Sequence, residues 1–272
     1  MEGSIEEISR RRTEMKGVVL AGGLGTRLLP MTQVTNKHLL PVYDRPMIYY
    51  PLQQLVACGI EDILMVTGGD SAGDFVKLLG DGQEFGIKNL SYAYQEGEGG
   101  IGQALSLARD FSAGGPIVVL LGDNLFQDSL SEAIRLYSKG EGAMILLKEV
   151  ESPERFGVPV LEDGRIVRIT EKPSDPPSRF AVTGCYFFDS RVFGIIDGLE
   201  FSSRGELEIT DVNNRYIEWG AMRHYVLDGW WTDAGTIPSL FQASRLVAED
   251  RSNPVLTGRK TDSPQLDRHM NE

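Results

Sequence analysis

The residues best suited to chemistry begin with a glycine-rich segment near the N-terminus, where residues 20–28 read Leu-Ala-Gly-Gly-Leu-Gly-Thr-Arg-Leu. Three glycines in four positions let the backbone turn sharply and present N–H groups to an anion with no side chain in the way. Arg27 adds a guanidinium that can hold two phosphate oxygens at once. The segment is not the dinucleotide-binding fingerprint, because Leu28 stands where the third glycine belongs. A glycine-rich turn is as often structural as functional, but the arginine inside this one favours phosphate binding.

Three ionisable side chains elsewhere could complete such a site. Lys37 is a cation in a segment otherwise rich in apolar residues and prolines, and Asp123 follows the apolar run 117–121. Asp233 lies in Trp-Trp-Thr-Asp-Ala-Gly-Thr, residues 230–236. Carboxylates at the ends of strands are hard oxygen ligands suited to Mg²⁺, which could neutralise a polyphosphate. Each residue also has an ordinary interpretation, as a surface lysine or a turn-forming aspartate.

The composition predicts a soluble chain with one large core. Of its 272 residues, 41% are hydrophobic, 24% charged and 8% aromatic, which excludes disorder, collagen and coiled coil for the whole. Twenty-seven basic residues against 39 acidic ones leave a net charge of −12, which disfavours nucleic acid and anionic membranes as partners. No run approaches the roughly 18 apolar residues of a membrane-spanning helix. An anionic ligand would therefore need clustered cations and backbone N–H groups at its site.

The two cysteines, Cys58 and Cys185, lie among apolar neighbours and are predicted to be reduced residues of the core. Reduced cysteines fit the cytosol, so we expect the protein to be cytoplasmic. Residues 1–15 are predicted to form an N-terminal extension, residues 16–250 one domain, and residues 251–272 a disordered tail.

Short β-branched runs alternate with helical patterns along the chain. Strands are predicted at 17–21, 63–67, 90–94, 116–121, 143–150, 166–170, 182–188 and 225–227. Helices are predicted at 47–58 with Pro46 in the first turn, along an apolar stripe at 101–111, at 208–219 and at 238–250. The alternation in the first half predicts a parallel sheet between helices, with ligands at the carboxyl ends of its strands. From about residue 151, frequent turns predict a smaller subregion of shorter strands.

Seven motifs occur in an order that is more specific than any one of them. They read Gly-Gly-x-Gly-Thr-Arg-Leu, Lys-x-Leu-Leu-Pro, Pro-Met-Ile-Tyr-Tyr, Leu-Gly-Asp-Asn, Glu-Lys-Pro, Arg-Gly-Glu-Leu-Glu-Ile-Thr-Asp and Trp-x-Asp-x-Gly-Thr. With these motifs the chain resembles the sugar-1-phosphate nucleotidyltransferases over about residues 16–248. The segment 99–105 is similar to the short spore-coat-polysaccharide branch of that family.

The resemblance implies a Rossmann-like α/β fold of the nucleotide-diphospho-sugar transferase type, with a mostly parallel central sheet and a smaller sugar-binding β subregion. It implies that the protein transfers a nucleotidyl group from dTTP to α-D-glucose 1-phosphate, giving dTDP-glucose and pyrophosphate, with Mg²⁺ as cofactor. We also expect a homo-oligomer. The same chemistry with UTP is the nearest alternative. A non-catalytic nucleotide-binding regulatory subunit and a dehydrogenase are alternatives from other classes.

The resemblance also implies roles for individual residues. The expected catalytic residues are Arg27, Lys37, Asp123 and Asp233, of which the two aspartates would hold Mg²⁺. The residues expected to bind the nucleotide, with Gln95 reading the base, are Gly22, Gly23, Gly25, Thr26, Arg27, Gln95, Gly100 and Asn124. The residues expected to bind the sugar phosphate are Gly157, Glu171, Lys172, Val182, Tyr186 and Trp231.

Three features depart from the thymidylyl enzymes of this family. His38 stands where they usually carry glutamine, residues 96–98 read Glu-Gly-Glu in place of a proline-containing stretch, and Gly102 replaces an alanine. These positions flank the expected base pocket, so the motifs leave the choice between dTTP and UTP open.

Overall fold

The computed structural model describes residues 15–137, 140–250, 253 and 256. Its strands are β1 (Lys16–Ala21), β2 (Pro41–Val42), β3 (Arg45–Pro46), β4 (Asp62–Gly68), β5 (Asn89–Gln95), β6 (Ile117–Leu121), β7 (Asn124–Phe126), β8 (Ala143–Glu149), β9 (Gly157–Glu162), β10 (Arg165–Glu171), β11 (Phe180–Phe188), β12 (Met222–Val226) and β13 (Trp231–Asp233). Its α-helices are α2 (Tyr49–Ala57), α3 (Ala72–Leu79), α4 (Gly100–Ser106), α5 (Arg109–Ser112), α6 (Ser131–Leu136), α7 (Val192–Asp197), α8 (Ile209–Glu218) and α9 (Ile237–Glu249). Short 3₁₀ helices include η1 (Thr26–Leu28), η3 (Lys37–Leu39) and η6 (Pro153–Arg155). The expected N-terminal extension and C-terminal tail lie almost wholly outside the described residues.

Seven strands form the central sheet, in the order β12, β8, β11, β6, β1, β4, β5. β1 pairs in parallel with β4 and β6, β4 with β5, and β8 with β12. Within the described residues, β11 is the one strand of this sheet that runs antiparallel to its neighbours, β6 and β8. The prediction of an α/β fold with a mostly parallel sheet is therefore confirmed.

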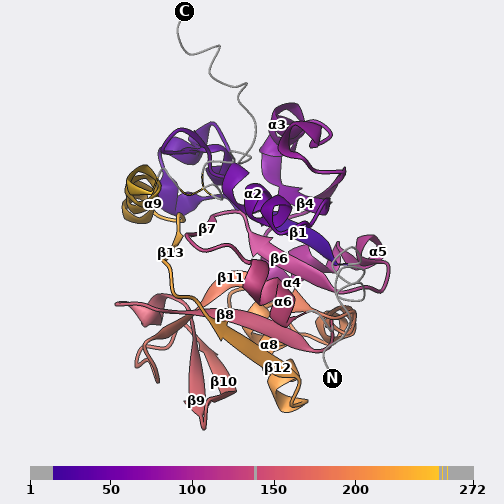
Figure 1. Ribbon diagram of the computed structural model, residues 1–272, viewed down its shortest axis with the longest axis vertical. Helices are drawn as coiled ribbons and strands as arrows, with labels where there is room; N and C mark the ends of the chain where they lie inside the picture. Colours follow the sequence, from indigo (N-terminus) through magenta and orange to yellow (C-terminus); the bar gives the residue numbers. More distant parts are fainter. Residues whose placement is uncertain (1–14, 138–139, 251–252, 254–255, 257–272) are drawn as a thin grey trace, which may run out of the picture.

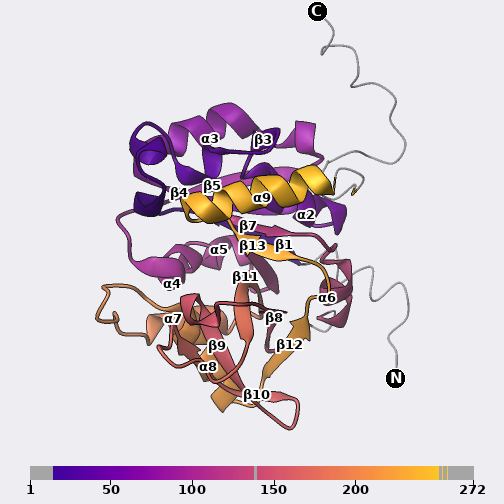
Figure 2. The same cartoon turned by 90° about the vertical axis from the view of Figure 1, so that its left-hand side faces the viewer.

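Helices cover both faces of this sheet because its strands are apolar on both sides (Figures 1 and 2). Along β1, Val19 packs in one cluster with residues of α2, α3 and α6, whereas Val18 and Leu20 pack in another with α4, α7 and α8. Helix α9 packs instead on β2 and β13, and Figure 2 shows it beside β13. There it joins a third cluster that includes Leu28 of η1.

A separate two-stranded sheet forms from β9 and β10, at the lower end of the molecule in Figure 1. Asp163 and Gly164 connect these strands with φ values of 48° and 72°, a turn geometry that matches the twist of a hairpin. The predicted smaller β subregion is this hairpin, against which α8 packs. β11 and β12, although they follow residue 151, belong to the main sheet.

Several elements differ from the prediction. Helix α2 begins at Tyr49 rather than at residue 47, because Pro46 pairs with Pro41 in the β2–β3 ribbon. The apolar stripe at 101–111 is divided between α4 and α5, with the break after Ser106. β12 begins earlier than expected because it follows the register of β8, and the three-residue strands β7 and β13 were not predicted.

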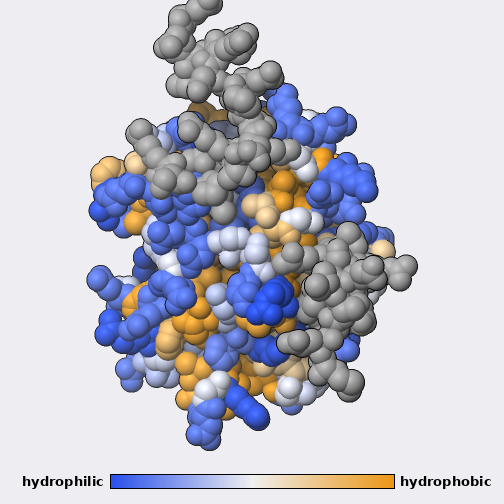
Figure 3. Space-filling view, in the orientation of Figure 1, coloured by the Kyte–Doolittle hydropathy of each residue, from blue (hydrophilic) through white to orange (hydrophobic). Residues whose placement is uncertain are grey.

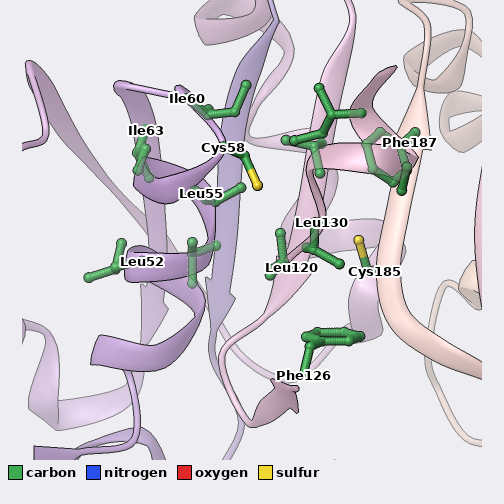
Figure 4. Packing of buried hydrophobic residues seen from close by; sticks show 14 of the residues in the cluster. Leu52, Leu55, Cys58, Ile60, Ile63, Leu120, Phe126, Leu130, Cys185 and Phe187 are labelled. Carbon is green, nitrogen blue, oxygen red and sulfur yellow. The ribbon is translucent and has the colours of Figure 1, made fainter. Parts of the chain in front are cut away.

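Both cysteines are reduced and buried, as predicted, and Figure 4 shows their sulfurs within one apolar cluster. Cys58 follows α2 and Cys185 lies on β11, near Leu120 and Phe126. Burial raises the pKa of the Cys185 thiol, which keeps this thiol protonated. The two residues therefore act as core side chains.

Hydrophilic side chains cover much of the face seen in Figure 3, with apolar side chains gathered between them in its lower half. Single large apolar residues such as Val34 and Phe241 are also exposed, at 90% and 74%. Across the described ranges, none of the helices combines the length and apolar character that crossing a bilayer would demand.

Candidate active site

The glycine-rich segment leaves the carboxyl end of β1 as an open turn. Gly23 and Gly25 have φ values of 91° and 65°, which other residues rarely adopt. A Cβ on Gly22 would lie 2.7 Å from Oε1 of Gln95, so a side chain at this position would displace that amide. The turn ends in η1, which carries Arg27 toward the same end of the sheet.

Lys37 and Asp123 form an ion pair beside this turn. The side-chain oxygen of Asn36 caps η3 by accepting the backbone N–H of His38 at 2.9 Å. Nζ of Lys37, on the same short helix, donates to Oδ2 of Asp123 at 2.5 Å. Burial alone would raise the pKa of Asp123, but the ammonium group of Lys37 holds that pKa well below its usual range. Asp123 is therefore anionic at neutral pH.

Strand pairing brings the second carboxylate to the first. β7 begins directly after Asp123 and pairs antiparallel with β13, so that Asp233 lies opposite Asn124. The backbone N–H of Ala234 donates to the carbonyl of Asp123 at 2.7 Å. The two aspartates therefore sit side by side at the ends of a short ribbon.

Gly235 marks the point at which the charged groups meet. A Cβ on Gly235 would lie 3.2 Å from Nη2 of Arg27, 3.4 Å from Oδ2 of Asp233 and 3.5 Å from Oδ2 of Asp123. The arginine of the glycine-rich turn and both carboxylates thus surround one small space, although they come from three separate segments.

Asp233 has a different electrostatic environment from Asp123. Burial and the charge of Asp123 raise the pKa of Asp233, whereas Arg155 and Arg27 oppose that shift. Nη2 of Arg155 lies 3.3 Å from Oδ1 of Asp233. Two carboxylates that repel each other in this way would be stabilised by a divalent cation between them.

This donor set fits Mg²⁺ bound together with substrate phosphates. Asp123 and Asp233 direct hard oxygen atoms toward the same space. Within the part of the chain that the structure describes, no group of three or more His, Cys, Asp or Glu could hold a metal ion. Mg²⁺ is commonly bound through one or two carboxylates, with phosphates and water as its other ligands.

The expected base-binding residues lie at the carboxyl ends of β4 and β5. Gln95 ends β5 opposite Gly68 of β4 and is 6% exposed. Gly100 begins α4 with a φ of 82°, and a Cβ there would lie 3.0 Å from the carbonyl oxygen of Leu207. Because Oε1 of Gln95 faces Gly22, the expected base reader and the glycine-rich turn belong to one site.

Three expected sugar-phosphate residues lie together on the β9–β10 hairpin and just after it. Glu171 pairs with Gly157 across the hairpin, and Oγ1 of Thr210 donates to Oε2 of Glu171 at 2.6 Å. Lys172, with a φ of 42°, places Nζ 3.3 Å from Oε1 of Glu171. Nη2 of Arg204 lies 3.4 Å from the same oxygen. Two cations are thus gathered at one carboxylate oxygen.

Asn124 holds Asp123 in position. Its Nδ2 donates to Oδ1 of Asp123 at 2.9 Å, and its Oδ1 accepts from Nε1 of Trp231 at 2.7 Å and from the backbone N–H of Gly184 at 2.8 Å. Both ends of the amide are engaged, so the structure gives Asn124 and Trp231 a positioning role. Their expected contacts with nucleotide and sugar stay predictions.

Tyr186 and Val182 project from β11 and are buried. Burial raises the pKa of the Tyr186 phenol, and the charges of Glu171 and Asp123 raise it further. The ring of Phe156, the residue before Gly157, lies 5.0 Å from that of Trp231, two residues before Asp233, so the sugar-side and metal-side segments are in contact.

Two cavities lie near different parts of this arrangement. One of about 550 Å³ opens beside Asp233 and is lined by Arg155, Phe156 and Trp231 among others. A larger one of about 1340 Å³ lies between β10, α8 and β12, and none of the expected site residues lines it. Because the ionisable groups converge at Asp233, we place the candidate active site there.

Sequence reasoning missed three residues that contact the carboxylates. Arg204 and Thr210 belong to the Arg-Gly-Glu-Leu-Glu-Ile-Thr-Asp motif, so the motif itself was the available signal. Arg155 carries no such signal because its partner, Asp233, is 78 residues away in the chain.

This fold and this site define a class of enzyme. Residues 16–250 match the family described as Nucleotidyl transferase, and the chain belongs to that family. Such enzymes generally use a divalent metal.

Within that family, the chain is similar to glucose-1-phosphate thymidylyltransferases. It is 44% identical to the one from Neisseria meningitidis serogroup A / serotype 4A, over 86% of this chain and 82% of that protein. It is 42% identical to that of Mycolicibacterium smegmatis, over 92% of this chain and 87% of that protein.

Solved structures of two such enzymes share this fold. A structure from Bacillus anthracis, assigned as a glucose-1-phosphate thymidylyltransferase and solved with sucrose, has a TM-score of 0.82 and 50% identity over 85% of this chain and 94% of that chain. A UDP-glucose pyrophosphorylase solved with UDP-glucose has a TM-score of 0.76 and 26% identity, over 86% of this chain and 98% of that chain.

Proposed function

We propose that the chain transfers a thymidylyl group from dTTP to α-D-glucose 1-phosphate, giving dTDP-glucose and pyrophosphate. The observation that carries this proposal is the convergence of Arg27, Asp123 and Asp233 around Gly235. The relatives that are 42% to 44% identical to this chain over 86% to 92% of its length are glucose-1-phosphate thymidylyltransferases.

The reaction needs charge neutralisation more than it needs a base. The second pKa of a phosphate monoester is about 6, so the sugar phosphate is already a dianionic nucleophile at neutral pH. The glycine-rich turn positions the triphosphate for in-line attack on its α-phosphorus. Arg27 and Lys37 stabilise the charge that develops on the triphosphate during that attack. Mg²⁺, held by Asp123 and Asp233, would neutralise the α-phosphate and the leaving pyrophosphate.

The hairpin side of the site would hold the second substrate. Lys172 and Arg204 both contact Glu171, and a sugar phosphate would draw these two cations to its own oxygens. Oε1 of Glu171 would then be free to accept hydrogen bonds from sugar hydroxyls, beside Gly157.

Uridylyl transfer from UTP is the second candidate function. The fold is shared with UDP-glucose pyrophosphorylase at 26% identity. Thymine and uracil present the same hydrogen-bonding edge, so a reader such as Gln95 does not separate them. Because the relatives at 42% to 44% identity are thymidylyltransferases, we expect the ratio of kcat/KM for dTTP to that for UTP to exceed one.

A pyrophosphate-release screen tests the proposal. The purified chain is supplied with Mg²⁺, with each of dTTP, UTP, ATP and GTP, and with glucose 1-phosphate or other sugar 1-phosphates. We expect pyrophosphate and dTDP-glucose in equal amounts with dTTP and glucose 1-phosphate. If no pair of substrates reacts but nucleotide still binds, the result would support a regulatory subunit. Tight binding of NAD would support a dehydrogenase.

Assembly, compartment and partners also belong to this proposal. We expect a homo-oligomer in the cytoplasm whose partners are its two substrates, without nucleic acid or membrane. Sedimentation measures the oligomeric state and cell fractionation the compartment. A mass of 30.0 kDa in solution, which is that of one chain, would contradict the homo-oligomer.

A further inference from the structure

The amide of Gln95 is held by a second glutamine that the function has not yet used. Nε2 of Gln95 donates to the carbonyl of Gly100 at 3.2 Å and to Oε1 of Gln103 at 2.8 Å. That same Oε1 of Gln103 accepts the backbone N–H of Gly99 at 3.0 Å. Two amide side chains and two backbone groups thus form one continuous chain of hydrogen bonds.

Backbone groups at both ends fix which way each amide points. The N–H of Gly99 can only donate, so Gln103 must turn its oxygen toward it. The carbonyl of Gly100 can only accept, so Gln95 must turn its nitrogen toward it. Flipping either amide would place donor against donor or acceptor against acceptor within a largely buried network, and unsatisfied buried polar groups cost free energy.

Both N–H groups of Gln95 are therefore used inside the protein, and its oxygen is left for a ligand. That oxygen faces the glycine-rich turn, 2.7 Å from where a Cβ of Gly22 would stand. The atom that Gln95 offers to the nucleotide site is therefore an acceptor.

We propose that Gln103 is a positioning residue that fixes Gln95 as a hydrogen-bond acceptor and so sets the choice of base. The inference rests on the proposed function, in which Gln95 reads the base. An acceptor pairs with the ring N–H that thymine, uracil and guanine present on their Watson–Crick edge. Cytosine and adenine place an unprotonated ring nitrogen there, which would leave two acceptors facing each other.

Substituting Gln103 tests the inference through a ratio of rates. In Gln103→Leu the amide of Gln95 loses the shorter of its two hydrogen bonds and keeps only the one of 3.2 Å to the carbonyl of Gly100, so its NH₂ group turns more readily to the ring nitrogen of cytosine. We expect the ratio of kcat/KM for dTTP to that for dCTP to fall by about 10- to 100-fold, which is the discrimination that one hydrogen-bonded contact to a base edge provides. Gln103→Glu keeps an acceptor for Gly99 and Gln95 and should retain most of the ratio.

A merely structural role for Gln103 predicts something else. Loss of packing would lower the rates with both nucleotides equally and leave the ratio unchanged, so an unchanged ratio in folded Gln103→Leu overturns the inference. Gln103→Met, which keeps the length of the side chain, gives the same test where the leucine variant does not fold. A wild-type chain that uses neither dTTP nor UTP would refute the proposed function itself, whereas pyrimidine turnover with an unchanged variant ratio would refute only the role of Gln103.

Discussion

At the scale of single residues, Gly235 is the position that the charged groups of the site surround. Its missing Cβ would stand within 3.5 Å of Arg27, Asp233 and Asp123. No rule that reads local spacing would assign a role to this glycine, because its neighbours come from segments far apart in the chain. The Trp-x-Asp-x-Gly-Thr motif contained it nonetheless.

Gly235→Ala should therefore lower activity without unfolding the protein. The added methyl group would occupy the space in which the phosphates and metal belong, and we expect kcat/KM for dTTP to fall about 10-fold or more. Gly73→Ala is the matched control, since a Cβ there meets nothing within 4 Å and its activity should be unchanged. Equal activity of the two variants would contradict the placement of the site.

Glu98 is a residue whose substitution should improve binding. Its Oε1 accepts the backbone N–H of Leu24 at 2.9 Å, and this N–H belongs to the turn expected to bind the triphosphate. A bound phosphate would have to displace that carboxylate and would be repelled by its charge.

We expect Glu98→Ala to lower KM for dTTP by about two- to tenfold, because one screened charge and one competing hydrogen bond are removed. Glu96→Ala makes the same change of charge two residues away and controls for the general field. Initial rates over a range of dTTP concentrations measure both. A KM that is unchanged or higher in Glu98→Ala alone would show that the contact does not compete with nucleotide.

At the scale of elements, the site depends on strands too short to be read from sequence. The longer strands were predicted because each carries several apolar or β-branched residues. β7 and β13 have three residues each, and their pairing across more than a hundred positions places Asp233 opposite Asn124. Such pairing depends on tertiary register, which no local pattern encodes.

Asp189 connects three further elements of the second half. It accepts from the backbone N–H of Gly142 before β8 at 2.7 Å, from the phenol of Tyr216 on α8 at 2.8 Å, and from Arg191 before α7 at 2.6 Å. Burial alone would raise the pKa of Asp189, but these hydrogen bonds outweigh it and lower that pKa. Its charged form therefore stabilises the fold.

We expect Asp189→Asn to lower the free energy of unfolding at pH 7 by about 1–3 kcal/mol, because hydrogen bonds to a charged group are lost. Since folding lowers the pKa of Asp189, this contribution is full above the unfolded value of about 4 and is lost as the pH falls toward the folded value. Urea denaturation at pH 7 and at pH 3 measures the difference, which should shrink at the lower pH. The exposed Asp197→Asn serves as control, and a difference that grew toward low pH would contradict the assignment.

At the scale of the whole molecule, fold class was predictable and the shape of the cleft was not. The β/α alternation indicated a mostly parallel sheet, and the order of seven motifs indicated which residues to follow. The burial of Asn124 and the contact of Arg155 with Asp233 required the complete fold, because both depend on segments that meet only in three dimensions. Sequence reasoning thus supplied the candidate residues, and the structure supplied their mutual positions.

The central claim is that Asp123 and Asp233 act as a unit on one metal–triphosphate complex. A double-mutant cycle measures this directly, through kcat/KM for dTDP-glucose formation by Asp123→Asn, Asp233→Asn and the double variant. Residues that serve one function together show strongly non-additive losses. We predict that each single variant loses about 10²–10³-fold and that the double variant loses little more. Losses that multiply in the double variant, or a single variant that turns over at the parent rate, would contradict this account.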